Sequence, residues 1–280
     1  HLARIEATRG RARGRLEIDT YVTGHSDEIA RLAAGSVLAL VDTVLGGEAA
    51  NGLAAVRPPG HHATPTRAMG FCLLNNVAVA ARYAQRQHGL GRVAIVDIDV
   101  HHGNGTQDIF YSDPSVLFIS THQSPLYPGT GALGETGAGA GQGTTINVPL
   151  PPGTGDAGYL AVMEWVIAPA LRRFVQELLF VSVGFDAHWA DPLAQMALSL
   201  RGYDAMMRQL VALAGELCEG RMVVVLEGGY HLGALANGWM NAIRALLGDA
   251  DYADPLGPAG GGEPEISGLI DRILKLHNLP

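Results

Sequence analysis

Short segments rich in β-branched apolar residues recur along the chain. Val93–Ile98, Leu178–Val183 and Met222–Leu226 are nearly continuous apolar runs, which is typical of strands buried on both faces of a sheet. Val116–Ser120 has a similar composition, and Leu53–Arg57 is a short strand pattern that ends at a Pro-Pro-Gly turn. We therefore expect a strand at each of these segments.

Segments with helical periodicity and capping residues lie between the expected strands. Ser26 precedes an acidic first turn, and Asn75 or Asn76 can cap the next helix. Pro169 is expected to kink or split a helix that begins near Asp156. Further helices are expected at 201–218, 232–247 and 266–277. Strands that alternate with such helices predict an α/β fold, in which a mostly parallel sheet has helices on both faces.

One long segment has neither pattern. Ser124–Gly143 is rich in glycine and lacks periodicity, which predicts a surface loop. Because such a long loop is uncommon in a compact domain, we expect it to have a function.

Composition narrows the chemistry that this fold can carry. The chain has 280 residues, of which 48% are hydrophobic and 16% charged, so it can bury a large core. Its two cysteines, Cys72 and Cys218, are too few for a disulfide framework or a thiolate zinc site. With 11 histidines and 27 acidic residues, a metal would be held by imidazole and carboxylate groups.

Charge and hydropathy argue against several kinds of partner. The net charge is −8 and no run of basic residues occurs, so we expect no nucleic-acid binding. The longest apolar stretches are too short to cross a bilayer, and the chain does not open with a signal-peptide pattern. We therefore expect a cytoplasmic protein without membrane contacts; a homo-oligomer is compatible with the sequence.

Reactive side chains follow four of the expected strands. In parallel α/β folds the active site lies beyond the carboxyl ends of the strands, so these side chains are expected at one rim. They are His61, His62, Asp99, His101, Asp186 and Tyr230.

Three of these residues form a candidate metal site. Asp99 and His101 are two residues apart, so their side chains share one side of an extended segment, and Asp186 can supply a third ligand. Such a set leaves an open position on a divalent ion, which would polarise a carbonyl and lower the pKa of a bound water. Asp97 can orient a histidine beside it. For an isolated Asp-x-His, a solvated turn or a helix cap is the alternative.

The remaining rim residues suggest acid–base chemistry. His61 and His62 follow a stiff turn and can act as general acid and base if their partners tune them differently; the alternative is that one of them only packs. Tyr230 follows two glycines and can donate to an oxyanion, or it can pack. Cys72 is expected to be a small buried residue. We expect His25, His88 and His277 at the surface, whereas His102 and His122 can be buried near the site.

Several motifs resemble those of histone deacetylases. They are Arg57–Ala63 (RPPGHHA), Gly70–Cys72 (GFC), Asp97–Gln107 (DIDVHHGNGTQ), Gly184–Ala187 (GFDA) and Leu226–Tyr230 (LEGGY). The resemblance runs from about Asp19 to Leu247 and is closest to class II and bacterial deacetylase-like amidohydrolases, including acetylpolyamine amidohydrolases. It implies an arginase-like α/β fold and zinc-dependent hydrolysis of N-acetyl amides.

The resemblance also implies roles for individual residues. The zinc ligands would be Asp99, His101 and Asp186. His62 would be the main general base and acid, His61 an electrostatic partner oriented by Asp97, and Tyr230 the residue that binds the carbonyl oxygen. The substrate channel would be lined by Gly70, Phe71, Tyr127, Asp19 and Leu193. Monovalent cations such as K⁺ would bind near Asp97, His101 and Ser120, and around Phe110, Asp113 and Val116.

Some positions discriminate within the family. Asn104 stands where class I members have a second carboxylate, which indicates the class II type and a lower pKa for His62. Dimanganese relatives have an aspartate in place of Gly103, so one metal is expected. Polyamine-selective eukaryotic members have a glutamate where Leu193 follows Asp191-Pro192, which weakens a polyamine preference.

These observations lead to one expected activity with two alternatives. We expect a zinc-dependent deacetylase of N-acetylated alkyl amines of the acetyl-lysine type. An acetylpolyamine deacetylase or a broad amide and ester hydrolase is the first alternative, and a non-catalytic binder of acylated ligands is the second. Residues 1–280 are expected to form a single domain that lacks an N-terminal strand–helix unit usual in the family.

Overall fold

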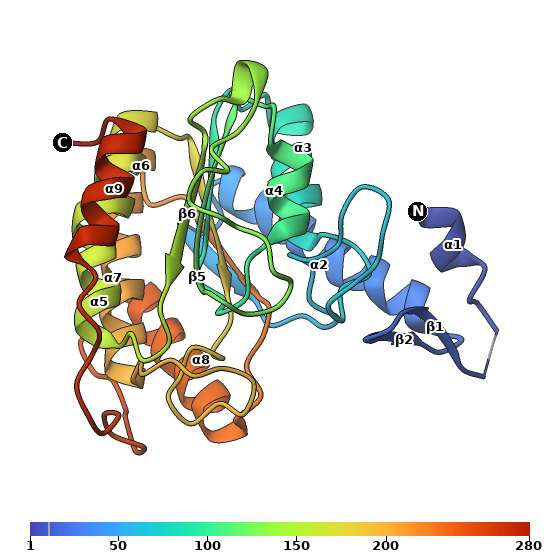
Figure 1. Ribbon diagram of the computed structural model, residues 1–280. Helices are drawn as coiled ribbons and strands as arrows, with labels where there is room; N and C mark the ends of the chain where they lie inside the picture. The colour runs from blue at the N-terminus through green and yellow to red at the C-terminus, as the bar shows by residue number, and fades with distance from the viewer. Residues whose placement is uncertain (11) are drawn as a thin grey trace.

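A six-stranded parallel sheet lies between two layers of helices in the computed structural model, which describes residues 1–10 and 12–280 (Figure 1). The strand order is β3-β8-β7-β4-β5-β6, and each neighbouring pair is parallel. The strands are β3 (Asn51–Ala54), β4 (Val93–Asp97), β5 (Val116–Gln123), β6 (Thr145–Leu150), β7 (Leu178–Val183) and β8 (Met222–Leu226). All six carboxyl ends therefore meet at one edge of the sheet.

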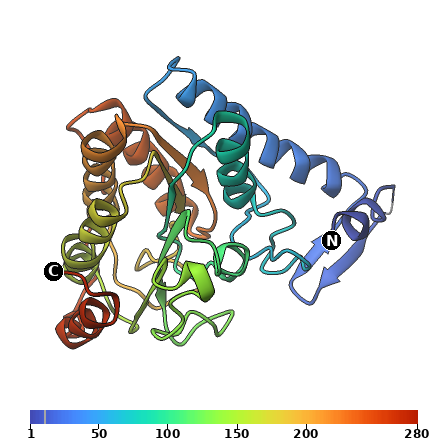
Figure 2. The same cartoon turned by 90° about the horizontal axis from the view of Figure 1, so that it is seen from above.

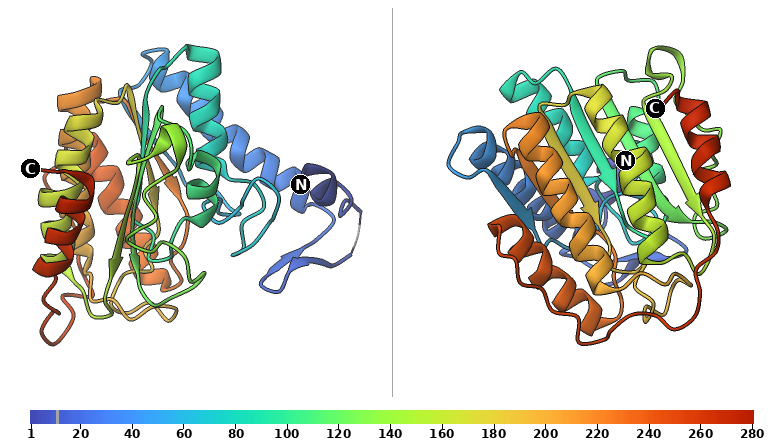
Figure 3. Two further views of the ribbon diagram at one scale, coloured as in Figure 1. Left: turned by 45° about the horizontal axis from the view of Figure 1, so that its top comes forward. Right: turned by 90° about the vertical axis from the view of Figure 1, so that its left-hand side faces the viewer.

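Helices cover both faces of the sheet, as Figures 2 and 3 show. One layer holds α2 (Ser26–Leu45), α3 (Asn76–His88) and α4 (Asn104–Phe110). The other holds α5 (Asp156–Val162), α6 (Ala168–Phe174), α7 (Leu200–Cys218), α8 (Leu232–Leu247) and α9 (Ser267–His277). Along β4, Ala94 and Val96 pack against the second layer, whereas Val93 and Ile95 pack against the first. Alternation along fully buried strands thus builds two cores on one sheet.

A small N-terminal unit lies beside α2. It consists of α1 (Leu2–Glu6) and the antiparallel hairpin of β1 (Gly14–Glu17) and β2 (Thr20–Val22), at the right of Figure 1. The buried side chains of Ile5 and Val22 pack in a third, smaller apolar cluster. The hairpin turn carries Asp19, whose Oδ1 accepts a hydrogen bond from the backbone N–H of Gly70 at 3.2 Å. The unit therefore contributes to the rim of the sheet.

The predicted fold class is confirmed, with differences in individual elements. Five predicted strands form, although β3 ends at Ala54 rather than Arg57. Pro169 stands in the first turn of α6, after the π-helical segment Met163–Ile167 that separates α5 from α6. The sequence analysis missed α1, β1, β2, α4 and β6. Edge strand β6 contains Pro149 and polar residues, so it lacks the apolar run that marks a central strand.

One surface prediction is wrong. His277 is only 5% exposed, because it lies on the same face of α9 as the buried Ile270 and Ile273. Among residues 1–10 and 12–280, no helix has the length and apolar composition that a membrane span needs.

Candidate active site

The predicted reactive residues meet at the carboxyl edge of the sheet. Asp97 is the last residue of β4, and Asp99 and His101 follow it. Asp186 follows β7, Tyr230 follows β8, and His61 and His62 lie beyond β3. Because these residues follow strands of one parallel sheet, the sheet fixes their backbone positions.

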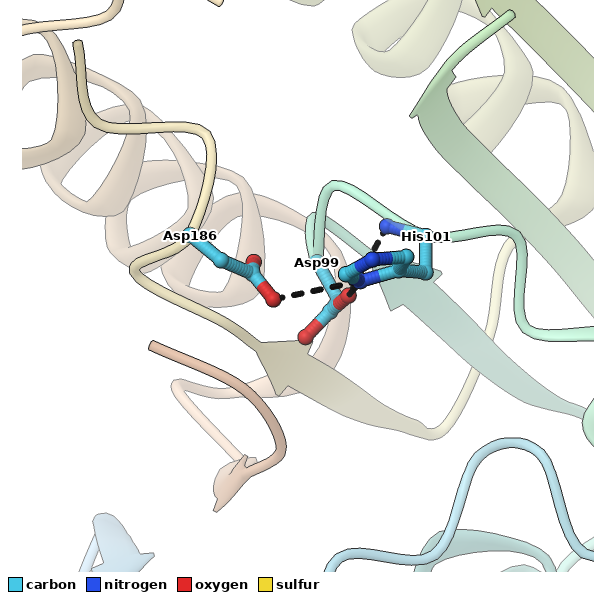
Figure 4. Close-up of side chains that lie close together, drawn as sticks. All are labelled: Asp99, His101 and Asp186. Carbon is cyan, nitrogen blue, oxygen red and sulfur yellow. Dashed lines mark hydrogen bonds and ion pairs between the residues drawn. The ribbon is translucent and has the colours of Figure 1, made fainter. Parts of the chain in front are cut away.

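Asp99, His101 and Asp186 form a compact cluster of ligand atoms (Figure 4). One nitrogen or oxygen from each lies within 4.8 Å of the others. His101 Nδ1 is 3.1 Å from Asp99 Oδ1 and 3.2 Å from Asp186 Oδ2. One imidazole and two carboxylates with their ligand atoms converging suit a divalent cation with open coordination positions.

The surroundings of the cluster fit a metal ion. Asp186 Oδ1 accepts from Val100 N–H at 3.0 Å, whereas Asp186 Oδ2 is buried without a hydrogen-bond donor among the described residues. Asp99 Oδ2 accepts from Gly228 N–H at 2.8 Å. A Cβ atom at Gly184 or Gly228 would overlap both carboxylates. Backbone groups thus orient the two carboxylates, and the glycines leave them space.

Electrostatics also favours a cation at the cluster. Burial and the nearby charge of Asp99 raise the pKa of Asp186 to about 6. Burial lowers the pKa of His101, but the carboxylates of Asp186 and Asp99 beside its Nδ1 outweigh it and raise that pKa to about 10. Two buried carboxylates side by side repel each other, so a positive charge between them would be stabilising.

His61 and His62 are adjacent but differ in their partners. Both rings are buried, and their centroids lie 4.0 Å apart. His61 Nδ1 donates to Asp97 Oδ2 at 3.0 Å, and His62 Nδ1 lies 2.8 Å from Asn104 Oδ1. Because an amide oxygen only accepts, His62 carries its proton on Nδ1, so its Nε2 has a free lone pair.

The charges around the pair give the two rings opposite pKa shifts. Burial lowers the pKa of His61, but the carboxylates of Asp97, Asp99 and Glu227 overcome that effect and raise it to about 10. Burial and the neighbouring His61 place the pKa of His62 well below its ordinary value. At neutral pH, His61 is therefore a cation and His62 a neutral base.

Glu227 holds the dihistidine segment in place, a role that the sequence analysis missed. Its Oε2 accepts from the backbone N–H groups of Gly60 at 2.7 Å and His61 at 3.1 Å, and its Oε1 accepts from Ser182 Oγ at 3.1 Å. The side chain is fully buried, and burial raises its pKa to about 7. The position of Glu227 in the sequence, directly after β8, could have indicated a place in the site.

A cavity of about 290 Å³ opens onto the ligand cluster. Phe71 and Tyr127, each 39% exposed, line it, and the Tyr127 ring meets His62 edge-on at a centroid distance of 5.2 Å. Burial and nearby Asp99 and Asp186 raise the pKa of Tyr230, so its hydroxyl stays protonated. All the predicted channel residues line the cavity: Gly70, Phe71, Tyr127, Asp19 and Leu193. Leu126 and Pro59 also line it and were not predicted.

Hydrogen bonds anchor the long loop that carries Tyr127. His102 Nδ1 accepts from Thr130 Oγ1 at 2.7 Å, and His122 Nε2 donates to the carbonyl of Gly131 at 3.0 Å. Glu135 accepts from the Gln107 side chain at 2.5 Å. Both histidines are buried and hydrogen-bonded, which the sequence had left open. The loop is thus an ordered part of the cavity wall.

The residues expected to hold monovalent cations lie in two places. Asp97 is opposite Ser120 in the β4–β5 register, and His101 follows β4 by four residues. Phe110 ends α4, and its carbonyl accepts from Asp113 N–H at 2.9 Å, just before Val116 begins β5. Because Asp113 forms a salt bridge with Arg82, carbonyl oxygens would be the main ligands there. Cation binding at either place stays a prediction.

Comparisons with known proteins agree with this geometry. The family model described as histone deacetylase domain matches residues 1–246. Histone deacetylase 10, chloroplastic, of Oryza sativa is 46% identical over 93% of this chain and 61% of its own length. The histone deacetylase-like amidohydrolase of Pseudomonas aeruginosa is 46% identical over 82% of this chain and 61% of its own length.

Structural comparison leads to the same family. The crystal structure of the HDA15 HD domain has a TM-score of 0.88 and 41% sequence identity, and the match covers 99% of this chain and 74% of that one. The chain spans about three fifths of the length of the curated relatives that it matches. The fold, the ligand cluster and these similarities together show that the chain belongs to the histone deacetylase family.

Proposed function

We propose that this protein is a zinc-dependent deacetylase that hydrolyses N-acetylated alkyl amines of the acetyl-lysine type. The observation that carries the proposal is the meeting of three groups at the end of one cavity. These are the Asp99–His101–Asp186 cluster, the neutral His62 and the protonated Tyr230. Family membership supports the same reaction class.

The three ligands provide the site for one metal ion. A zinc ion bound there would act as a Lewis acid toward the acetyl carbonyl and would activate the attacking water. One imidazole and two carboxylates accept zinc and other divalent ions alike, and membership of the histone deacetylase family favours zinc among them.

The chain's own residues supply the proton transfers and hold the developing charge. His62 Nε2 takes a proton from the attacking water and later gives it to the leaving amine. The Tyr230 hydroxyl donates a hydrogen bond to the carbonyl oxygen as negative charge develops there. His61, held as a cation by Asp97, stabilises that negative charge through space.

The cavity supports a long, thin substrate. Phe71 and Tyr127 are placed to grip the methylene chain, and Asp19 at the rim can accept a hydrogen bond from the substrate backbone. Gly70 lies against the His62 ring so closely that a Cβ atom would overlap it, which keeps the passage open. Monovalent cations at the two places described above are proposed to act as structural ions.

A substrate panel tests this assignment on protein whose metal content has been measured. The panel compares acetyl-lysine peptides, acetylated polyamines, longer acyl-lysines and simple esters by kcat/KM. The proposal expects the highest kcat/KM for acetyl-lysine peptides. A preference for acetylated polyamines, or equal rates across amides and esters, would support the first alternative instead. Tight binding of a hydroxamate without hydrolysis of any substrate would identify an acyl-ligand binder and reject the enzyme.

A further inference from the structure

The carboxylate of Asp191 joins two loops at the mouth of the cavity. Its Oδ2 accepts from the backbone N–H groups of Tyr230 at 2.7 Å and His231 at 3.1 Å, and its Oδ1 accepts from Leu193 N–H at 3.0 Å. The residue is only 5% exposed. In the described part of the chain it forms no salt bridge, so backbone N–H groups meet its charge. One buried side chain thus fixes residues that line the cavity from two different loops.

Backbone contacts rather than side chains of its own hold the segment before Tyr230, including a hydrogen bond from Phe185 N–H to the Gly228 carbonyl at 3.2 Å. Gly228 and Gly229 have no side chains, and Gly229 has a φ of 121°, a conformation that suits only glycine. Gly228 N–H is bound to Asp99 Oδ2, so the ligand cluster fixes one end of this segment. At the other end, the contacts to Asp191 come directly before α8, where the helix dipole also favours a negative charge.

We propose that Asp191 is a positioning residue that places the Tyr230 hydroxyl and the Leu193 side chain for the same substrate. The proposal rests on the proposed deacetylase function. Asp191 touches neither substrate nor metal in this scheme. Its Oδ2 sets the position of the oxyanion donor, which affects kcat, and its Oδ1 sets the position of a channel wall, which affects KM.

Two substitutions separate the two contacts. Asp191→Ala removes both, so we expect kcat to fall about 10- to 100-fold and KM to rise. Asp191→Asn keeps an oxygen acceptor for Tyr230 and His231, but its amide NH₂ cannot accept from Leu193. We therefore expect this variant to keep kcat within about threefold of the wild type while KM rises.

A double-substitution cycle tests whether the effect on kcat passes through Tyr230. In a Tyr230→Phe background, the added Asp191→Ala change should lower kcat less than about threefold further, because the hydroxyl is already absent. Glu177→Ala is the matched control. Glu177 accepts from the backbone N–H groups of Gly91 and Arg92 at the opposite edge of the sheet, so this change should leave kcat and KM unchanged.

A binding measurement makes the result independent of turnover. Calorimetry with a hydroxamate on zinc-loaded protein should show weaker binding by Asp191→Ala and by Tyr230→Phe. In the Tyr230→Phe background, Asp191→Ala should weaken binding further by no more than Asp191→Asn does, because only the Leu193 contact remains to be lost. If wild-type protein binds the hydroxamate but hydrolyses no substrate, the proposed function fails while this test of Asp191 still stands.

The proposal is overturned by any of three results. They are a wild-type kcat, within twofold, in Asp191→Ala; an equal fall in kcat when Asp191→Ala is added to the Tyr230→Phe background; and, in Asp191→Asn, the full kcat loss of the alanine variant. Thermal unfolding of each variant shows whether it folds, and if the alanine variant does not fold, the asparagine variant and its kcat–KM split decide the question.

Discussion

At the scale of single residues, the site depends on giving two adjacent imidazoles different protonation states. His61 faces the carboxylate of Asp97, whereas His62 faces the neutral amide of Asn104. The rings share nearly the same burial, so the hydrogen-bond partner and the neighbouring charges decide the protonation state of each. The charge of the residue at position 104 should therefore control the pH at which His62 works as a base.

Asn104→Asp tests this control. A carboxylate at position 104 would stabilise the imidazolium form of His62 and raise its pKa, so the base would be lost at a higher pH than in the wild type. We expect the acid limb of the kcat/KM–pH profile to move up by about one unit. Asn51→Asp, on edge strand β3, serves as the control. An unchanged acid limb in Asn104→Asp would contradict the assignment of His62 as base.

Gly184→Ala tests whether close approach of the backbone to the ligand cluster is required. The added Cβ would overlap the carboxylates of Asp99 and Asp186, so we expect zinc affinity to fall at least about tenfold. Gly35→Ala, in the middle of α2 with open space at its Cβ position, is the control and should keep wild-type affinity. The measurement is competitive zinc titration against a chromogenic chelator. Equal affinities in the two variants would be inconsistent with the assigned ligands.

The candidate ligand and acid–base residues could be predicted from the sequence, but the residues that fix the positions of their loops could not. Asp99, His101 and Asp186 could be found because imidazole and carboxylate groups directly follow strands. Glu227 and Asp191 act through backbone N–H groups of segments far away in the chain. Such contacts leave no spacing pattern, so only the folded structure shows them.

At the scale of elements, the long loop between β5 and β6 is held by buried and half-buried side chains, of which Glu135 is half-buried. Glu135 accepts from the backbone N–H groups of Gly131 and Ala132 as well as from Gln107. These contacts lie on the same loop as Tyr127, which stands against His62. The shape of the channel wall therefore depends on Glu135.

Glu135→Ala is expected to loosen this wall. Because Tyr127 is proposed to contact the substrate chain and to take no part in proton transfer, KM should rise about three- to tenfold while kcat stays within about threefold. Gln142→Ala, which removes a hydrogen bond to Thr136 in the distal part of the loop, should leave KM unchanged. Steady-state kinetics with an acetyl-lysine peptide gives both constants. A fall in kcat at constant KM would place the role of Glu135 elsewhere.

Helix α9 is expected to make the protein sensitive to acid. Burial, and to a lesser extent Arg173, lowers the pKa of His277 to about 4. The unfolded chain, with an ordinary pKa near 6.5, takes up this proton first, so stability is lost as the pH falls from about 6.5 to 4. His277→Leu should raise the free energy of unfolding at pH 4.5 by about 1–2 kcal/mol more than at pH 7.5.

Urea unfolding at the two pH values measures this difference. His25→Leu, at a position where the side chain is 82% exposed, is the control and should change stability alike at both values. If the free energy of unfolding changes between the two pH values by the same amount in His277→Leu and in the wild type, burial of the neutral imidazole is not what lowers acid stability.

Elements could be predicted where their pattern was strong. Central strands such as β7 and long helices such as α8 were placed within a residue or two, because burial on both faces or a complete apolar stripe marks them. Helix α4 was missed, because its seven residues bury polar side chains such as Thr106 and Gln107 instead of an apolar stripe. Hairpin β1–β2 is short and only partly buried, so periodicity could not reveal it.

At the scale of the whole molecule, one sheet serves as the frame for every part of the site. Both cores pack against it, and its carboxyl edge carries the proposed metal ligands together with His62 and Tyr230. Strand β3 stands at one end of the strand order, with β8 as its neighbour. That residues 1–280 form a single domain, without an N-terminal strand–helix unit usual in the family, stays a prediction. The curated relatives are longer than this chain.

The most direct test of the account measures metal content and turnover together in three proteins: the wild type, His62→Ala and Tyr230→Phe. Neither substituted side chain belongs to the ligand cluster, so all three should bind one zinc ion per chain with similar affinity. We expect the wild type to deacetylate an acetyl-lysine peptide and each variant to lose at least about 100-fold in kcat. Near wild-type rates in both variants, with zinc fully bound, would contradict the account.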